Sequence, residues 1–373
     1  MLLRIHFFPG LVLLALGLGL LFEIARQLLK RRARGVTYFG AAGAALLLLG
    51  YLLEFQRVAR YFGVWGATWI ECAAIMEILG LVVAGFATMF WSNAELQPRR
   101  RALLQAAGAG LCIVPGVVAA FGIVNRNRFR LSEVDIPIPD LPKDLQGLRI
   151  VQVTDIHLSP FLSEPEFAHA IDMANETRAD LALVTGDLIS RRGDPLDACL
   201  RQLARLRAQA GVLGCLGNHE VYTGTENYVT AQGRRIGIEF LRHEAKVLRF
   251  GAADVNFAGV DYQRFHSHYL DGVDRLIRPG ALNILLSHNP DVFPVAARQG
   301  FHLTIAGHTH GGQVDFEILH QHIDIARVYT PYVRGLYRDG NSALYVSTGL
   351  GTIGVPIRIG APPEVSLIRL CAT

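Results

Sequence analysis

Five polar motifs, each placed directly after a short apolar run, constrain this chain more than any other feature of its sequence. Short runs rich in Val, Ile and Leu, separated by stretches typical of helices, predict buried strands of an α/β architecture. Ligand-binding side chains in such sheets gather at the carboxyl ends of the strands, so the motifs predict one shared site. In chain order they are Asp155-Ile156-His157, Gly186-Asp187, Gly217-Asn218-His219-Glu220, Ser287-His288 and Gly307-His308-Thr309-His310-Gly311-Gly312.

The last motif places two imidazoles two residues apart. In an extended chain, residues i and i+2 point to the same side, so the rings of His308 and His310 can face one pocket. Each motif alone also has an ordinary explanation. Asp155 or Asp187 could cap a following helix, and Gly217-Asn218 is a common turn dipeptide. Five such motifs in order favour a metal site over five separate coincidences.

The residue types of the motifs fit two divalent metal ions. Imidazole nitrogens combined with carboxylate and amide oxygens suit manganese, iron or zinc, and of these we favour manganese. Two ions about 3.5 to 4 Å apart need a shared ligand, and the Asp187 carboxylate is the natural candidate for this bridge. Open positions on such ions would bind a phosphate and activate water for its hydrolysis.

In this order the motifs resemble those of the calcineurin-like metallophosphoesterases, from about Leu148 to the C-terminus. The resemblance implies a four-layer αββα sandwich with two central mixed sheets over residues 148–373. It also implies a phosphoesterase or pyrophosphatase in which His219 binds no metal but acts as general acid or transition-state stabiliser above the phosphate. By the same resemblance, one ion would be held by Asp155, His157, Asp187 and His310, and the second by Asp187, Asn218, His288 and His308.

The chain is too apolar for an ordinary soluble enzyme, and part of it is expected to lie in lipid. The mean hydropathy of the whole chain is +0.30, and only 18% of its residues are charged. Four apolar segments are each near the roughly 17 to 25 residues that cross a bilayer as a helix, and predict a four-helix transmembrane domain over residues 1–128. A signal peptide is the alternative for the first of them. The segments are Phe7–Phe22, Val36–Phe55, Trp69–Trp91 and Ala102–Val124.

Charge predicts how this domain is oriented. Lys and Arg are slightly more frequent in the first and third predicted loops, so the positive-inside rule predicts a multi-pass protein of the cell (inner) membrane with an extracytoplasmic catalytic domain. The excess basic charge lies beside the membrane, which argues against a nucleic-acid partner. Glu77, inside the third segment, is either a functional carboxylate or one that is protonated or paired.

Residues 129–147 are expected to form a linker, because Pro137, Pro139 and Pro142 favour an extended chain. Such a short linker would keep the catalytic domain near the membrane surface, which favours a phosphorylated substrate that carries a lipid. Arg191 and Arg192 follow the second motif closely and could bind a phosphate or a charged head group, although two solvated surface residues explain them equally well.

Further glycine and proline patterns resemble the membrane-associated bacterial branch of the family, which includes UDP-diacylglucosamine pyrophosphohydrolase-like and other cell-envelope phosphoesterases. Four spans depart from the short anchor or export signal that is usual there. A phosphate-sensing or scaffold membrane protein without catalysis is the alternative function, and a transporter with a regulatory phosphoesterase domain is a third. The patterns are Arg334-Gly335-Leu336-Tyr337, Gly349-Leu350-Gly351-Thr352 and Pro362-Pro363-Glu364.

Overall fold

The computed structural model describes residues 120–373 except 265–267, 319–320, 325 and 355. The predicted transmembrane segments and Glu77 lie outside the described residues, apart from the end of the fourth segment, which belongs to a helix over residues 120–125. In the described part of the chain, no helix is long and apolar enough to cross a membrane. Gly122–Thr373 forms one compact unit.

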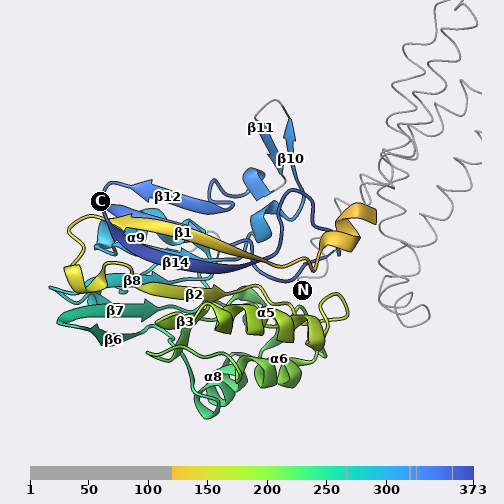
Figure 1. Ribbon diagram of the computed structural model, residues 1–373, viewed down its shortest axis with the longest axis horizontal. Coiled ribbons are helices and arrows are strands. Elements are labelled where there is room, and N and C mark those ends of the chain that lie inside the picture. Colours follow the sequence, from red (N-terminus) through yellow and green to blue (C-terminus); the bar gives the residue numbers. More distant parts are fainter. Residues whose placement is uncertain (1–119, 265–267, 319–320, 325, 355) are drawn as a thin grey trace, which may run out of the picture. The chain divides into compact units, whose positions relative to one another are not determined.

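The first sheet of this unit has the strand order β1-β14-β2-β3-β4-β5 (Figure 1). Strands β2 to β5 run parallel, whereas β14 is antiparallel to β2, so the sheet is mixed. Predicted apolar runs form its centre, because every residue of β3 and β4 is buried. The strands are β1 (Arg130–Ile138), β14 (Glu364–Ala372), β2 (Arg149–Val153), β3 (Leu181–Val184), β4 (Val212–Gly214) and β5 (Ile238–Phe240).

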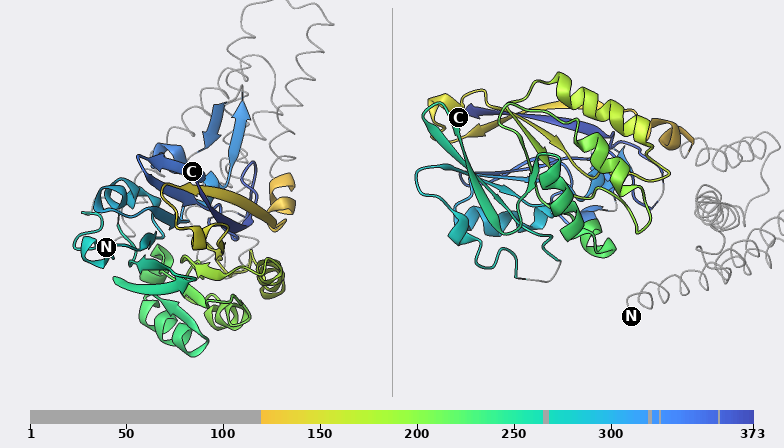
Figure 2. Two further views of the ribbon diagram at one scale, coloured as in Figure 1. Left: turned by 60° about the vertical axis from the view of Figure 1, so that its left-hand side comes forward. Right: turned by 90° about the horizontal axis from the view of Figure 1, so that it is seen from below.

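Helices cover the outer face of the first sheet, as the view from below shows (Figure 2). Helix α5 begins with a capping box in which Ser163 and Glu166 each accept the other's backbone N–H. Its buried positions recur at helical spacing and pack in one apolar cluster with the first sheet. The covering helices are α5 (Glu164–Glu176), α6 (Leu196–Leu203) and α8 (Glu226–Arg235), while the short helix α7 (Asn218–Thr223) follows β4.

The second sheet has the order β12-β13-β9-β8-β7-β6 and is also mixed, because only its four middle strands run parallel. Phe293 of α9 (Phe293–Gln299) packs on this sheet against Ala306, Leu344 and Val346. A hairpin of β10 (Asp315–Ile318) and β11 (Gln321–Asp324) projects from the domain (Figure 1). The sheet strands are β12 (Gly335–Asp339), β13 (Ser342–Val346), β9 (Leu303–Ala306), β8 (Leu282–Leu286), β7 (Ala253–Gly259) and β6 (Glu244–Phe250).

The two sheets pack face to face around a second apolar cluster. Side chains from both sheets are fully buried in it, and each contributes roughly 1.5 to 3 kcal/mol relative to an exposed position. This confirms the predicted α/β domain with two mixed sheets. The motifs follow the carboxyl ends of strands in both sheets, so the packing brings them to one edge. Ile150, Leu183, Phe257, Ile284 and Ile305 are representative members of the cluster.

The segment expected to be a linker is instead part of the first sheet. Strand β1 pairs in parallel with β14 from Arg130 opposite Glu364 to Ile138 opposite Ala372. Alternate residues point inward, and Ile136 and Ile138 are buried between the sheets. The prolines are compatible with this position, because the outer side of an edge strand needs no backbone N–H for pairing.

Candidate metal centre

The motif residues come together where five strands end. Ligand atoms of the motif residues form three overlapping groups, and the atoms of each group lie within 4.8 Å of one another. The first group is Asp155, His157 and His310, and the second is Asp187, His288 and His308. A third group, His157, Asp187 and His219, overlaps both. Asn218 lies at the start of α7 beside them. The structure thus brings all the predicted ligands to one edge of the two sheets. Asp155 and His157 follow β2, Asp187 follows β3, Asn218 follows β4, His288 follows β8, and His308 and His310 follow β9.

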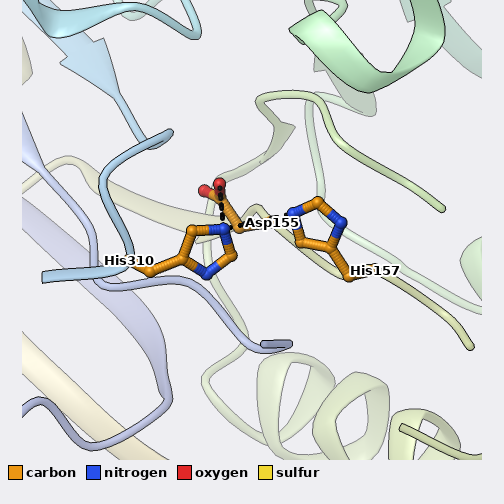
Figure 3. A group of neighbouring side chains, drawn as sticks. All are labelled: Asp155, His157 and His310. Atoms are coloured by element: carbon orange, nitrogen blue, oxygen red, sulfur yellow. Dashed lines mark hydrogen bonds and ion pairs between the residues drawn. The ribbon is translucent and has the colours of Figure 1, made fainter. Parts of the chain in front are cut away.

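The first group is buried and its donor atoms face each other (Figure 3). Nε2 of His310 lies 3.4 Å from Oδ1 of Asp155 and 3.1 Å from Nε2 of His157. Asp155 and His157 have no exposed surface, and His310 is only 3% exposed. Water therefore has little access to the inner side of this group.

Asp187 joins the first group to the second. Its Oδ2 lies 3.5 Å from Nε2 of His157 and 3.0 Å from Nε2 of His288. His308 completes the second group. One carboxylate oxygen thus faces histidines of both groups, which is the geometry that a bridging ligand requires.

Hydrogen bonds set the orientation of three rings. Nδ1 of His288 lies 2.7 Å from the Thr185 carbonyl oxygen, and Nδ1 of His310 lies 3.3 Å from that of Gly351. A carbonyl can only accept, so each Nδ1 carries a proton and each Nε2 faces the centre, where it can bind a metal ion once it is unprotonated. Nδ1 of His157 lies 3.2 Å from the Ser190 hydroxyl, which orients this ring, although a hydroxyl can either donate to this nitrogen or accept from it.

The side chain of Asn218 fits a cation site. Its side-chain Oδ1 is buried and has no hydrogen-bond partner among the described residues. A buried polar atom without a partner costs roughly 1 to 3 kcal/mol. A divalent ion would satisfy this oxygen, and the N–H of the next residue, His219, donates to Oδ1 of Asp187, so Asn218 lies close to the candidate bridging ligand.

The loops that carry these residues have unusual backbone conformations. Asp155, His157, Asp187, His308 and His310 have φ values of 50°, 47°, 57°, 78° and 53°. This left-handed region costs a non-glycine residue on the order of 1 to 2 kcal/mol, and such strain is concentrated at functional sites. His308 and His310 are therefore not in an extended chain, and their rings belong to different groups instead of one.

Electrostatics differ sharply between the histidines. Burial lowers the pKa of His157 and of His308 to about 3. Burial also opposes the charged form of His288, but the carboxylates of Asp187 and Asp155 outweigh it and raise the pKa of His288 to about 10. Without metal, the second group therefore holds a proton between His288 and Asp187 at neutral pH.

His219 lies at the open side of the centre. Its ring packs edge-on against His157 with 4.6 Å between ring centroids, and Tyr222, which is 66% exposed, packs on it from outside. Nδ1 of His219 donates to the Ser190 carbonyl at 2.6 Å, while its backbone N–H donates to Oδ1 of Asp187 at 2.8 Å. The ring is thus held beside the predicted ligands.

Arg191 and Arg192 follow Ser190 in the loop that contacts both His157 and His219. Oδ2 of Asp194 closes this loop by accepting the backbone N–H groups of Ser190 and Arg191. Both arginine side chains are exposed. The structure thus places them on a loop at the rim of the centre.

Glu220 has a role that the sequence did not reveal. Its buried Oε2 accepts the backbone N–H groups of Asp187 and Gly217, and its Oε1 accepts that of Leu188. It therefore joins the loops after β3 and β4. The available signal was an acidic residue three positions after the Gly217 that begins α7, a typical capping position.

A cavity of about 690 Å³ lies elsewhere, at the amino-terminal ends of β8, β9 and β13. Pro139, Phe301, His302 and Ser342 are among its lining residues. None of the predicted ligands lines it, so it is not part of the metal centre.

Comparison with known proteins identifies the family to which this domain is similar. Residues 148–312 match the family model for calcineurin-like phosphoesterases. A transmembrane protein with metallophosphoesterase domain from Danio rerio is 30% identical over 69% of this chain and 61% of its own length. An uncharacterized metallophosphoesterase from Campylobacter jejuni is 31% identical over 64% of this chain and 63% of its own length. The uncharacterized metallophosphoesterase YkuE from Bacillus subtilis is 28% identical over 62% of this chain and 82% of its own length. More than a third of each of the first two relatives lies outside the match. The chain carries a calcineurin-like metallophosphoesterase domain.

Proposed function

We propose that this chain is a membrane-anchored phosphoesterase that uses two divalent metal ions to hydrolyse phosphoester or pyrophosphate bonds. The observation that carries the proposal is the position of Asp187, whose Oδ2 faces His157 of one group and His288 of the other. A single oxygen between two sets of nitrogen and oxygen donors is suited to binding a pair of ions.

The donor set fits such a pair. If His157 and His310 both present lone pairs at Nε2, the two atoms repel each other at 3.1 Å unless a cation lies between them and the carboxylates. The mixed nitrogen and oxygen ligands suit manganese, iron or zinc, and we favour manganese. We assign Asp155, His157, Asp187 and His310 to one ion, and Asp187, Asn218, His288 and His308 to the other.

The chemistry that such ions supply when bound is activation of water and neutralisation of charge on phosphate oxygens. His219 would hold a proton on Nε2 and donate it to the leaving oxygen, while the Ser190 carbonyl keeps its other nitrogen protonated and the ring in place. Arg191 and Arg192 would bind phosphate oxygens or a charged head group from the rim.

Membrane attachment is supported by the apolar segments of residues 1–128 and by the transmembrane relatives from Danio rerio and Bos taurus. We place the protein in the cell (inner) membrane with several spans and an extracytoplasmic catalytic domain, because of the basic residues in the predicted first and third loops. A lipid-linked phosphoester or pyrophosphate is the substrate class that this location favours.

The test is hydrolysis by the full chain in detergent with manganese added. Bis-p-nitrophenyl phosphate, p-nitrophenyl phosphate and a lipid pyrophosphate are compared, and the preferred compound identifies the bond type. Asp187→Ala should lose both turnover and metal. His219→Ala should keep two ions but lose about 10²- to 10⁴-fold in turnover. Two bound ions without turnover on any compound would contradict the proposal and support a phosphate-sensing protein instead.

A further inference from the structure

Arg358 lies in the loop between β13 and β14, and it is one of the most unusual residues of the domain. Its side chain carries a positive charge, yet the residue is only 2% exposed. In the described residues no ion pair joins it to a carboxylate. Its nitrogens instead donate to backbone carbonyl oxygens: Thr348 at 2.9 Å, Gly349 at 3.2 Å, Gly351 at 2.5 and 3.1 Å, Ala361 at 3.0 Å and His310 at 3.4 Å.

A buried guanidinium costs several kcal/mol unless it is well hydrogen-bonded. Burial lowers the pKa of Arg358 to about 10, while the nearby carboxylates of Asp155 and Glu364 favour the charged form. The side chain therefore stays charged at neutral pH. An aliphatic residue could fill the same space without the free-energy cost of burying a charge. The hydrogen bonds that Arg358 donates to several carbonyl oxygens therefore explain its presence better than packing does.

One of these carbonyls bears directly on the metal centre. The Gly351 oxygen accepts from Arg358 and also from Nδ1 of His310, at 3.3 Å. One guanidinium nitrogen of Arg358 also lies 3.5 Å from this Nδ1, so Arg358 contacts the His310 ring directly as well. Gly351 also contacts a second member of the first group, because its N–H donates to the backbone oxygen of Asp155 at 2.7 Å. A shift of Gly351 would therefore disturb two of the four residues assigned to the first ion.

We infer that Arg358 is a positioning residue for the first metal ion. It holds the Gly351 carbonyl against Nδ1 of His310, which keeps the Nε2 lone pair of His310 directed at Asp155 and His157. The inference rests on the metal site of the proposed function, but it concerns metal affinity and does not depend on which substrate is hydrolysed.

The chain offers a matched pair of variants. Arg358→Lys keeps the charge but replaces a planar fork of five donors with one ammonium group, which cannot reach the same carbonyls together. Arg369→Lys makes the same change at an exposed residue of β14 that pairs with Asp135. Metal content and affinity are measured on the full chain in detergent by equilibrium dialysis with manganese. Arg358→Lys should bind one ion as the unchanged protein does and the other about 10- to 100-fold more weakly, whereas Arg369→Lys should bind both normally.

A second comparison separates positioning from a general effect on the fold. If Arg358 acts through His310, then Arg358→Lys should add little further loss once His310→Gln is present, because the two changes remove the same contact. Arg358→Gln, which removes the charge but keeps an amide donor, is measured alongside, and retention of the second ion shows that the fold is intact.

Three results would overturn the inference: unchanged affinity for both ions in Arg358→Lys, equal weakening of both ions, or loss of folding in both Arg358 variants, which would assign the residue to the fold alone. A protein that binds two ions without hydrolysing any phosphoester would remove the proposed function. The selective loss of one ion would still support the inference about Arg358 in that case.

Discussion

Oε2 of Glu220 accepts the backbone N–H of Asp187 at 2.9 Å. The same oxygen accepts the N–H of Gly217 at 2.8 Å, so one buried carboxylate holds the loop of the bridging candidate against the loop that precedes Asn218. The distance between ligands from β3 and β4 is therefore set by a residue that contacts no metal in the proposed assignment. Loop geometry at this centre depends on such supporting contacts as much as on the ligands.

Glu220→Gln tests this contact. The amide of glutamine would place an NH2 group opposite the N–H of Leu188, which leaves two buried donors facing each other. We expect the free energy of unfolding to fall by about 2 kcal/mol. Urea unfolding of the metal-free protein measures it, and Glu176→Gln, at an exposed position of α5, should stay within about 0.5 kcal/mol of the unchanged protein. Equal stability of both variants would show that the carboxylate is not needed.

Asn218→Ala should reduce metal binding from two ions to one without unfolding the protein. The buried Oδ1 has no partner among the described residues, so its removal breaks no hydrogen bond of the fold there. Its loss takes away one oxygen assigned to the second ion. Metal analysis of the purified protein, with a thermal unfolding curve as control for folding, checks this. Two tightly bound ions in the variant would remove Asn218 from the ligand set.

Metal binding should release about one proton from His288 at pH 7.5. The pKa of His288 is raised from 6.5 to about 10 in the metal-free fold. Its charge therefore stabilises that fold fully below pH 6.5, and this stability is lost as the pH rises through about 10. Between these values a metal must displace the proton, so metal affinity should increase with pH. His157, with a pKa of about 3, has no proton to release there.

Calorimetric titration with manganese, repeated in buffers of different ionisation enthalpy, counts these protons. His288→Asn should bind metal more weakly and release none. Release of the same number of protons by this variant would assign the proton to another residue.

Gly307→Ala should weaken binding of the first metal ion. A Cβ at this position would lie 2.2 Å from Oδ2 of Asp155, so the carboxylate would have to move away from His310. We expect at least a tenfold loss of affinity, by analogy with other changes that misplace a ligand. Gly280→Ala is the control: its φ of +79° makes the change costly for the fold, but its Cβ would meet nothing within 4 Å. Loss of metal in both variants would indicate a general effect of instability.

The central strands could be predicted because their residues are apolar on both faces. Every residue of β3, β8 and β9 is buried, and each strand appears in the sequence as a short apolar run, interrupted only by Asn283 in β8 and Thr304 in β9. Strands β6 and β12 lie at the edge of the second sheet, and most of their residues are exposed or half-buried, so no such run marks them. The same holds for β1, whose single proline, Pro137, was compatible with a linker as well as with an edge strand.

The candidate ligands could be predicted because the motifs consist of the residue types that bind metal ions. The shape of the site could not be predicted from the sequence. The left-handed backbone at His308 and His310 depends on contacts with distant loops, and it separates rings that an extended chain would keep together. Arg358 was missed for a different reason. Its partners are backbone carbonyls, which every sequence contains, so no pattern of residue types marks the contact.

The position of β14 has a consequence for biosynthesis. This strand lies between β1 and β2 in the first sheet, although β1 and β2 are made before any other strand of the domain and β14 after all of them. While the chain emerges from the ribosome, β1 and β2 therefore lack β14, the strand that pairs with both of them in the finished sheet. Their unpaired edges are open to association with other chains until translation has passed Ala372. Folding of this domain is therefore completed only by the strand that is synthesised last.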